Sequence, residues 1–332
     1  MLDSLLQLTI DKHASDLHLS PGQVPIMRID GDLIFLQNHA VLTSAVIEML
    51  LNKILNETAK QQFQAELSHD FAYQLEDKAR FRVNAFYQAE GVALVFRAIP
   101  THIPTLDELS LPNTIKSLLD LPHGLILVTG PTGSGKSTTL AAMVNYLNTN
   151  HALHLISIED PIEFKHQSRN SLISQRQIKR DAHCYSSALQ AALREDPDVI
   201  LVGEMRDLET IRLALTAAET GHLILATLHT SSAPRTINRL IDVFPAEEKN
   251  MIRNMLSESL QAVICQTLIK KIHGGRVAAF EIMLANNAIR HLIREDKIAQ
   301  MINVIQTNGQ AGMCTLSQSL SQLAGKGLIY SE

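Results

Sequence analysis

An eight-residue run near the middle of the chain restricts what it can fold into more than any other feature. Residues 130–137 read Gly-Pro-Thr-Gly-Ser-Gly-Lys-Ser, directly after the apolar run 125–128 and before the helix-forming residues 138–143. This is a complete P-loop pattern in its required strand–loop–helix context. Its glycines allow backbone N–H groups to turn onto phosphate oxygens, while Lys136 adds a positive charge and Ser137 a hydroxyl for Mg²⁺. The pattern predicts an ATP-binding loop formed by Gly130, Pro131, Thr132, Gly133, Ser134, Gly135, Lys136, Ser137 and Thr138.

Length and composition limit the classes of protein that this chain can represent. Its 332 residues exceed the roughly 250 to 300 at which one hydrophobic core stops growing, so two domains are expected. The net charge of -5 and the pI near 6.3 disfavour a nucleic acid as the main partner, because nucleic-acid binders carry a basic excess. Three cysteines are too few for a four-cysteine zinc site. No apolar run approaches roughly 18 residues and the start resembles no signal peptide, so a cytosolic protein is expected.

Strand-like runs and hairpin signals dominate the first hundred residues. Asp30-Gly31, between two apolar runs, is a strong hairpin signal, and three strand-like runs follow at 69–75, 79–88 and 92–99. Residues 1–99 are therefore predicted to form a small α+β domain. Pro100, Pro104 and Pro112 remove backbone donors and disfavour helix in the preceding residues, which predicts a linker over residues 100–112.

Residues 113–332 are predicted to form a second, larger domain. Strands and helices alternate along it, at 125–129, 136–147, 153–158, 186–194, 199–202, 208–218 and 223–227. This alternation predicts a mostly parallel sheet with helices on both faces, so the expected fold class of the chain is α/β. The remainder adds a helix at 247–260, strands near 263–269 and 276–283, and three further helical stretches.

Carboxylates follow two predicted strands of the second domain. The apolar run 199–202 leads through a glycine to Glu204, an arrangement of Walker B type with Glu in place of the commoner Asp. The preceding strand leads into Glu159, Asp160 and Glu163. Because the carboxyl ends of parallel strands meet at one edge of a sheet, these acids are expected beside the P-loop, with Glu204 binding Mg²⁺ through water. Simple solvation of a loop end is the alternative for any single one of them.

Two histidines lie on either side of the predicted strand 223–227. Seven extended positions at roughly 3.3 Å each separate His222 from His229 by about 23 Å, too far for one metal ion. His229 follows the strand and can face the phosphates, whereas His222 precedes it and is expected to meet another chain or helix. Ordinary structural hydrogen bonding is the alternative for both.

Phosphoryl transfer also requires positive charge near the γ-phosphate, often from an arginine of another domain or subunit. Alternation along strand 79–88 places Arg80 and Arg82 on one face of the predicted sheet, and Arg97 lies on the next strand. We therefore take Arg82 and Arg97 as candidate catalytic arginines. The alternative is a solvated sheet face whose arginines pair with neighbouring acids. Further candidates, without a periodicity argument, are Arg194, Arg206 and Arg239.

Several segments together resemble one known family. Residues 14–20 read Ala-Ser-Asp-Leu-His-Leu-Ser, residues 79–86 read Ala-Arg-Phe-Arg-Val-Asn-Ala-Phe, residues 158–163 read Ile-Glu-Asp-Pro-Ile-Glu, and residues 193–198 read Leu-Arg-Glu-Asp-Pro-Asp. With the P-loop, they are similar to the secretion ATPases that drive type IV pili and type II secretion. The resemblance covers essentially the whole chain.

The resemblance implies a fold, an activity and roles for individual residues. It implies a PAS-like N-terminal domain and a RecA-like ATPase domain, in a ring of six subunits that hold ATP between the domains and convert hydrolysis into domain rotation. Residues 159–163 would be the family's Asp box with Glu163 as catalytic base. Glu204 would be the Walker B acid, and His222 and His229 would form its His box.

Two features resemble the branch of the family that retracts pili. The assembly ATPases carry a four-cysteine zinc insertion, for which this chain has too few cysteines, and a long N-terminal extension, which is not expected here. Residues 288–295 match the C-terminal signature associated with retraction, with His291 where family members often have Asn. Core packing alone would explain the apolar stripe of Ile289, Leu292 and Ile293 in this segment.

The resemblance also implies partners and a location. The expected partners are further copies of the chain, the PilC-like platform protein of the inner membrane and, as another candidate, the accessory retraction ATPase PilU. The expected location is the cytoplasmic face of the inner membrane at the pilus base. Alternatives are a PilU-like accessory paralogue, a related secretion or DNA-uptake ATPase, and a nucleotide-gated structural ring without useful turnover. No nucleic-acid partner is expected.

Overall fold

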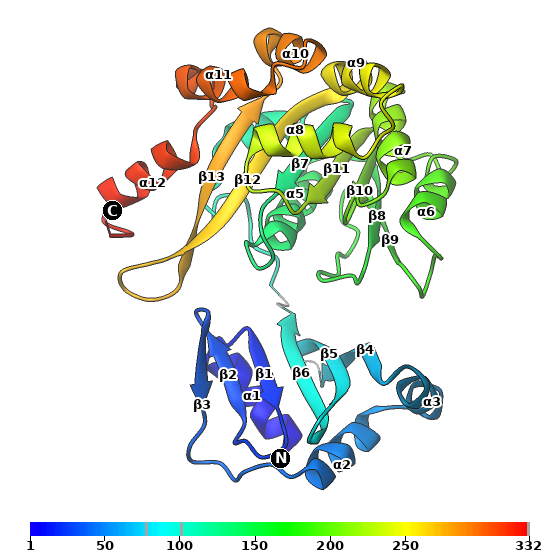
Figure 1. The fold of residues 1–332 in the computed structure, drawn as a ribbon, viewed down its shortest axis with the longest axis vertical. Coiled ribbons are helices and arrows are strands. Elements are labelled where there is room, and N and C mark those ends of the chain that lie inside the picture. Colours follow the sequence, from blue (N-terminus) through cyan, green and yellow to red (C-terminus); the bar gives the residue numbers. More distant parts are fainter. Residues whose placement is uncertain (77–78, 100–101, 331–332) are drawn as a thin grey trace. The chain divides into compact units, whose positions relative to one another are not determined.

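The computed structural model describes residues 1–76, 79–99 and 102–330 of the chain (Figure 1). The internal contacts divide the chain into two compact units, Met1–His102 and Ile103–Glu332. Of the predicted linker, Pro100 and Thr101 lie outside the described residues. The predicted boundaries at 1–99, 100–112 and 113–332 therefore stay a prediction.

The described residues of the first unit form an antiparallel sheet with three α-helices. Its described strands have the order β3-β2-β1-β6-β5-β4. Their bounds are β1 Asp16–Leu19, β2 Ile26–Ile29, β3 Asp32–Phe35, β4 Ser68–Leu75, β5 Ala79–Gln88 and β6 Gly91–Ile99, and the helices are α1 Leu2–Asp11, α2 Ser44–Ile54 and α3 Glu57–Glu66. The expected alternation along β5 is confirmed, because Phe81, Val83 and Ala85 are buried while Arg80 and Arg82 are only partly buried. The buried face packs into one hydrophobic core with the helices.

The second unit is built on a mostly parallel sheet. Its described strands have the order β13-β12-β7-β11-β10-β8-β9, and only the edge strand β13 runs antiparallel to its neighbour. The strands are β7 Gly124–Thr129, β8 His154–Glu159, β9 Leu172–Gln177, β10 Val199–Val202, β11 Leu223–Leu228, β12 Leu260–Lys270 and β13 Arg276–Leu284. The helices are α4 Thr114–Leu119, α5 Lys136–Asn150, α6 Tyr185–Ala192, α7 Leu208–Glu219, α8 Ala233–Asp242, α9 Lys249–Ser259, α10 Asn287–Arg294, α11 Met301–Thr307 and α12 Leu316–Gly325.

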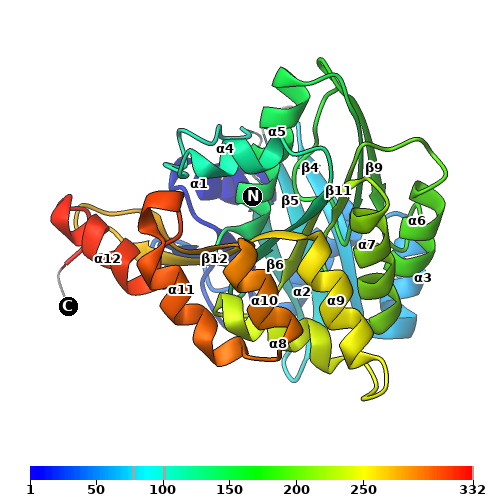
Figure 2. The same ribbon diagram turned by 90° about the horizontal axis from the view of Figure 1, so that it is seen from above.

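Helices cover both faces of this sheet. The α4 and α5 helices pack on one face, against side chains such as Ile126 and Val128 of β7. Helices α6 to α11 pack on the opposite face, against Leu125 and Leu127 of the same strand. Figure 2 shows α4 and α5 on one side and α7, α9 and α10 on the other. Because β7 is buried on both faces, its sequence is a continuous apolar run rather than an alternating one. The predicted α/β fold class is confirmed.

The apolar stripe predicted in residues 288–295 faces the core. Ile289, Leu292 and Ile293 of α10 are buried in the same cluster as α9 and α11, as core packing alone would require. The side chains of Arg290 and Arg294 reach back to α9, where they bond the carbonyl of Ser257 and the carboxylate of Glu258 respectively.

Three elements of the second unit were not predicted from the sequence. The β9 strand reads Leu-Ile-Ser-Gln-Arg-Gln and lies at the edge of the sheet, so it lacks the apolar run of a central strand. The α4 helix is short, and α8 has a proline in its first turn. Within the described residues, no helix is both long and apolar enough to span a bilayer.

Candidate nucleotide-binding site

The P-loop joins the carboxyl end of β7 to the start of α5. Its glycines are required by the backbone geometry, since Gly135 has a φ of +88° at the N-cap of α5. Gly130 has a φ of +144°, and a Cβ there would lie 2.3 Å from the backbone oxygen of Gln266. A side chain at either position would therefore open the loop. The α5 helix directs its first backbone N–H groups into this loop, which favours binding of an anion.

A buried glutamine on β12, which the sequence analysis did not single out, holds the P-loop in place. The Gln266 amide nitrogen donates to the Ser134 carbonyl oxygen at 2.7 Å. The Gln266 amide oxygen accepts from the Thr139 hydroxyl, also at 2.7 Å. One side chain thus ties the loop and the first turn of α5 to the neighbouring strand. Its sequence signal is weak, because β12 reads Leu-Gln-Ala-Val-Ile-Cys-Gln-Thr-Leu-Ile-Lys and carries a second glutamine, Gln261.

Lys136 lies in the mouth of the P-loop. Its ammonium group donates to the carbonyl oxygens of Gly130 and Pro131, at 2.8 and 3.0 Å, and lies 3.4 Å from Nδ1 of His229. Burial lowers the pKa of Lys136, and the carboxylates of Glu204 and Glu163 act in the opposite direction. His229 links the lysine to one of these carboxylates, because its other ring nitrogen lies 3.3 Å from Glu204. Residues from three strand ends therefore converge at the loop, as predicted.

An unpartnered hydroxyl in the same loop is suited to bond a phosphate oxygen. Among the side chains of the described residues, the buried Ser134 Oγ has no hydrogen-bond partner. The Lys136 ammonium group, which bonds carbonyl oxygens of the same loop, is a second donor there. A buried donor without a partner costs free energy, so an acceptor supplied by a ligand would stabilise it. The donor set suits a nucleotide phosphate.

Glu204 follows β10, in the middle of the sheet. Its carboxylate lies 2.6 Å from the guanidinium of Arg206 and 3.3 Å from Nε2 of His229. Partial burial acts to raise the pKa of Glu204, but the Arg206 hydrogen bond and the charge of His229 outweigh it, so the pKa is lowered. The carboxylate is thus held in its charged form, which suits a group that binds a cation.

His229 and His222 lie at opposite ends of β11, as predicted. The His229 ring stands between Lys136 and Glu204, with one ring nitrogen toward each. His222 instead caps the neighbouring helix, since its backbone N–H and Nδ1 both meet the carbonyl oxygen of Ala217 in α7. The expectation that His222 meets a helix is therefore met within the chain. No group of three or more metal-ligating His, Cys, Asp or Glu side chains occurs in the described residues.

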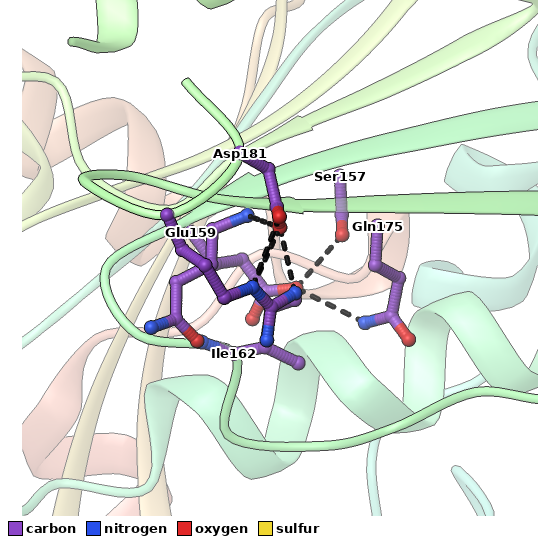
Figure 3. A network of polar contacts seen from close by, with 7 residues as sticks. Ser157, Glu159, Ile162, Gln175 and Asp181 are labelled. Carbon is purple, nitrogen blue, oxygen red and sulfur yellow. Dashed lines mark hydrogen bonds and ion pairs between the residues drawn. The ribbon is translucent and has the colours of Figure 1, made fainter. Parts of the chain in front are cut away.

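The loop after β8 carries Glu163, and Glu159 lies at its base. The Glu159 carboxylate accepts hydrogen bonds from the Ser157 hydroxyl at 2.8 Å and from the Gln175 amide at 3.2 Å (Figure 3). Burial raises the pKa of Glu159 to about 7; these two hydrogen bonds oppose the shift, and the charge of Glu163 adds to it. Glu159 and Glu163 are both partly buried. They differ in environment, because Glu159 ends β8 with its carboxylate held by two side-chain hydrogen bonds, whereas Glu163 lies on the loop that follows.

The candidate arginines of the first unit are engaged within that unit. Arg97 Nε donates to the buried carboxylate of Asp16 at 2.8 Å. Arg82 Nε lies 3.6 Å from Asp70 Oδ1, beyond hydrogen-bond distance. This pairing matches the alternative of a sheet face whose arginines bond neighbouring acids, and a role in catalysis stays a prediction.

The other arginine candidates occupy different places in the second unit. Arg206 bonds Glu204 directly and so belongs to the site. Arg239 lies in the last turn of α8, and Arg194 follows α6. Arg206 is thus the candidate that contacts a site residue directly.

The chain is similar to known secretion ATPases along its whole length. A family model described as type II/IV secretion system protein matches residues 1–274. The type IV pilus retractation ATPase PilT of Pseudomonas aeruginosa is 56% identical over 331 residues, which cover 100% of this chain and 96% of that protein. The twitching motility protein of Neisseria gonorrhoeae is 52% identical over 93% of this chain and 82% of its own length.

Solved structures give the same result. A crystal structure of the pilus retraction motor PilT with bound ADP is 44% identical and superposes with a TM-score of 0.88, covering 99% of this chain and 94% of that one. The Legionella pneumophila ATPase DotB is 28% identical, with a TM-score of 0.89 over 99% of this chain and 93% of its own. The resemblance expected from the sequence motifs is confirmed.

Proposed function

The chain belongs to the type II/IV secretion system protein family, and from this premise we propose that it is an ATP-hydrolysing motor that powers type IV pilus retraction. One observation carries the proposal, the 56% identity to a pilus retraction ATPase over 331 residues. The site supports it, because Lys136, Glu204 and His229 lie together beside a P-loop with an unpartnered buried donor.

The site residues take complementary roles in this proposal. The backbone N–H groups of residues 130–138 bind the phosphates, together with the ammonium group of Lys136. The Ser137 hydroxyl and the Glu204 carboxylate, the latter through water, would hold Mg²⁺, which when bound neutralises phosphate charge. Glu163 accepts the proton of the attacking water as general base.

His229 and two arginines complete the proposed machinery. His229 contacts both Lys136 and Glu204, so it can keep the lysine and the carboxylate at a fixed separation. Arg82 and Arg97 supply positive charge for the γ-phosphate. Each arginine must leave its present carboxylate, Asp70 or Asp16, to do so.

The assembly and its partners are part of the same proposal. We propose a homohexamer at the cytoplasmic face of the inner membrane, at the base of the pilus. There it would act on a PilC-like platform protein, with PilU as a further candidate partner. The similarity to a pilus retraction motor supports this assignment, and the net charge of -5 disfavours a nucleic acid in that place.

A complementation experiment tests the proposal. A strain lacking the gene would receive the wild-type chain, Glu163→Ala or the control Glu219→Ala, which removes an exposed carboxylate at the end of α7. Retraction of labelled pili and phosphate release by the purified proteins would be measured. We expect Glu163→Ala to bind nucleotide normally but to lose turnover by about 100-fold or more, and retraction with it, while Glu219→Ala behaves as wild type.

Three outcomes would contradict the proposal. Normal retraction in the deletion strain would indicate an accessory paralogue. Full retraction without measurable phosphate release would indicate a nucleotide-gated structural ring. Undiminished phosphate release by Glu163→Ala would remove this residue as the base.

A further inference from the structure

The loop that carries Glu163 lacks regular backbone pairing, and glutamines of the edge strand β9 hold it. Residues 160–168 belong to no helix or strand. Gln175 of β9 accepts from the backbone N–H of His166 at 2.8 Å and donates to the backbone oxygen of Phe164 at 2.9 Å. The side-chain amide of Gln175 thus provides two hydrogen bonds to the loop backbone, in place of the bonds between backbones that hold a strand or helix.

The same amide also reaches the buried carboxylate at the base of the loop. Gln175 Nε2 donates to Glu159 Oε1, which also accepts from Ser157, and Figure 3 shows the side chains of Ser157 and Gln175 beside this carboxylate. The amide of Gln175 therefore fixes the backbone on the C-terminal side of Glu163 and links it to the Glu159 carboxylate.

A second glutamine of β9 acts on the N-terminal side of Glu163. The amide oxygen of Gln177 accepts from the backbone N–H of Ile162 at 3.4 Å, which is a weak bond. Gln175 and Gln177 are two positions apart on one strand, so their side chains emerge on the same side. The residue between them points the other way, and Arg176 bonds Glu195. Only the glutamine side of β9 faces the loop.

We propose that Gln175 is a positioning residue for Glu163 in the hydrolytic step. It sets the path of residues 163–166, and so the place from which the Glu163 carboxylate reaches the attacking water. Misplacement of a reacting group by about 1 Å can cost on the order of 100-fold in rate without loss of substrate binding. This inference rests on the proposed role of Glu163 as general base.

The first test separates turnover from binding in Gln175→Ala. We expect kcat to fall by about 10- to 100-fold, while KM for ATP and the affinity for ADP change by less than about twofold. The matched control is Ser174→Ala on the same strand, which removes one hydrogen bond to His154 and points away from the loop. A comparable fall in kcat for Ser174→Ala would show that general weakening of β9 is responsible and would overturn the proposal.

A double-mutant cycle tests whether Gln175 acts through Glu163. In the Glu163→Ala background, Gln175→Ala should lower the residual kcat by less than about twofold, because the group that it positions is absent. Equal losses in both backgrounds would overturn the proposal. Normal turnover by Glu163→Ala alone would show that the proposed base is wrong. Normal turnover by Gln175→Ala, together with an inactive Glu163→Ala, would instead overturn only the proposed role of Gln175.

Exchanging the Gln175 amide and the Glu159 carboxylate provides a test that does not depend on the folding of Gln175→Ala. Gln175→Glu keeps an acceptor for His166 but brings a second carboxylate to Glu159, so kcat should fall. Adding Glu159→Gln restores one donor and one acceptor to the pair, and we expect kcat to rise by at least about threefold over Gln175→Glu alone. Absence of any recovery in a folded double variant would contradict the proposal.

Discussion

Lys136 and Glu204 of the candidate site in the second unit are more shielded from solvent than Arg97 and Arg82 on the sheet face of the first unit. Lys136 is buried and the Glu204 side chain keeps 18% of its surface exposed, while the side chain of His229, which contacts both, keeps 42%. On the sheet face of the first unit, the side chains of Arg97 and Arg82 keep 57% and 37% of their surface exposed. Both regions nevertheless carry residues that the sequence predicts to act on a nucleotide.

The difference shows which part of the machinery is preorganised. Charges in a poorly solvated site interact strongly and keep their geometry, because neighbouring strands and backbone amides fix them. The exposed Arg82–Asp70 pair contributes little free energy, so Arg82 can exchange its carboxylate for another anion at small cost. Arg97 must give up a hydrogen bond to the buried carboxylate of Asp16. The second unit can therefore bind phosphate as it stands, while the arginines of the first unit must change partners.

The largest expected effect comes from Lys136→Ala. Removal of a buried cation that faces two carboxylates and the P-loop should weaken nucleotide binding by at least about 100-fold, since charge-assisted hydrogen bonds to phosphate are lost. Fluorescent ADP titrated into the purified protein measures this. Lys249→Ala is the control, because that lysine pairs with Asp242 on the surface of the second unit. An affinity of Lys136→Ala for ADP within about tenfold of wild type would contradict a preorganised phosphate site in the second unit.

A second effect is the pH dependence that Glu159 gives to stability. Its folded pKa of about 7 lies above the ordinary value of 4.5, so the folded state binds the proton more tightly than the unfolded state. The favourable contribution of protonated Glu159 to the free energy of unfolding is full below pH 4.5 and is lost as the pH rises through 7. The loss should amount to roughly 2 to 3 kcal/mol, and Glu159→Gln should abolish it.

Denaturant titrations of the wild type and Glu159→Gln between pH 5 and 8 measure this loss. Asp242→Asn, which changes an exposed carboxylate of the same unit, is the control and should leave the pH dependence intact. If the free energy of unfolding depended on pH in the same way in the wild type and in Glu159→Gln, the Glu159 carboxylate would be less buried than its contacts indicate.

The smallest effects are expected on the arginine face. Arg97→Ala leaves the buried carboxylate of Asp16 with the Ser15 hydroxyl as its remaining side-chain donor, so it should destabilise the protein by about 1 to 2 kcal/mol. Arg82→Ala removes an exposed, loosely aligned pair and should cost less than about 0.5 kcal/mol. Thermal unfolding of both variants makes the comparison. Equal losses would show that Arg82 is as firmly engaged as Arg97.

The P-loop and the strand ends were predictable because their signals are local. A strand, a glycine-rich turn and a helix in sequence allow one backbone path, and the parallel sheet places Glu204 and His229 at the same edge. Alternation along β5 likewise separates Arg82 from the core. Each of these inferences needs only near neighbours in the chain and a side-chain period.

The residues that hold the site in place gave no such signal. Gln266 bonds Thr139 and Ser134, which are 127 and 132 positions away in the sequence. Gln175 belongs to an edge strand whose polar sequence resembles a loop, so neither the strand nor its contacts could be predicted. A glutamine has no periodicity of its own, and its partners depend on which strand lies beside it.

The sequence by itself determined the phosphate-binding loop, the α/β class and the faces on which charged residues lie, since steric limits and hydrophobic periodicity act between residues close in the chain. Only the tertiary structure decided that Gln266 supports the loop, that Gln175 holds the segment carrying Glu163, and that Arg97 bonds Asp16. The physical reason is that a hydrogen bond requires two groups within about 3 Å in a suitable orientation, and strand order and register set that distance for residues far apart in sequence.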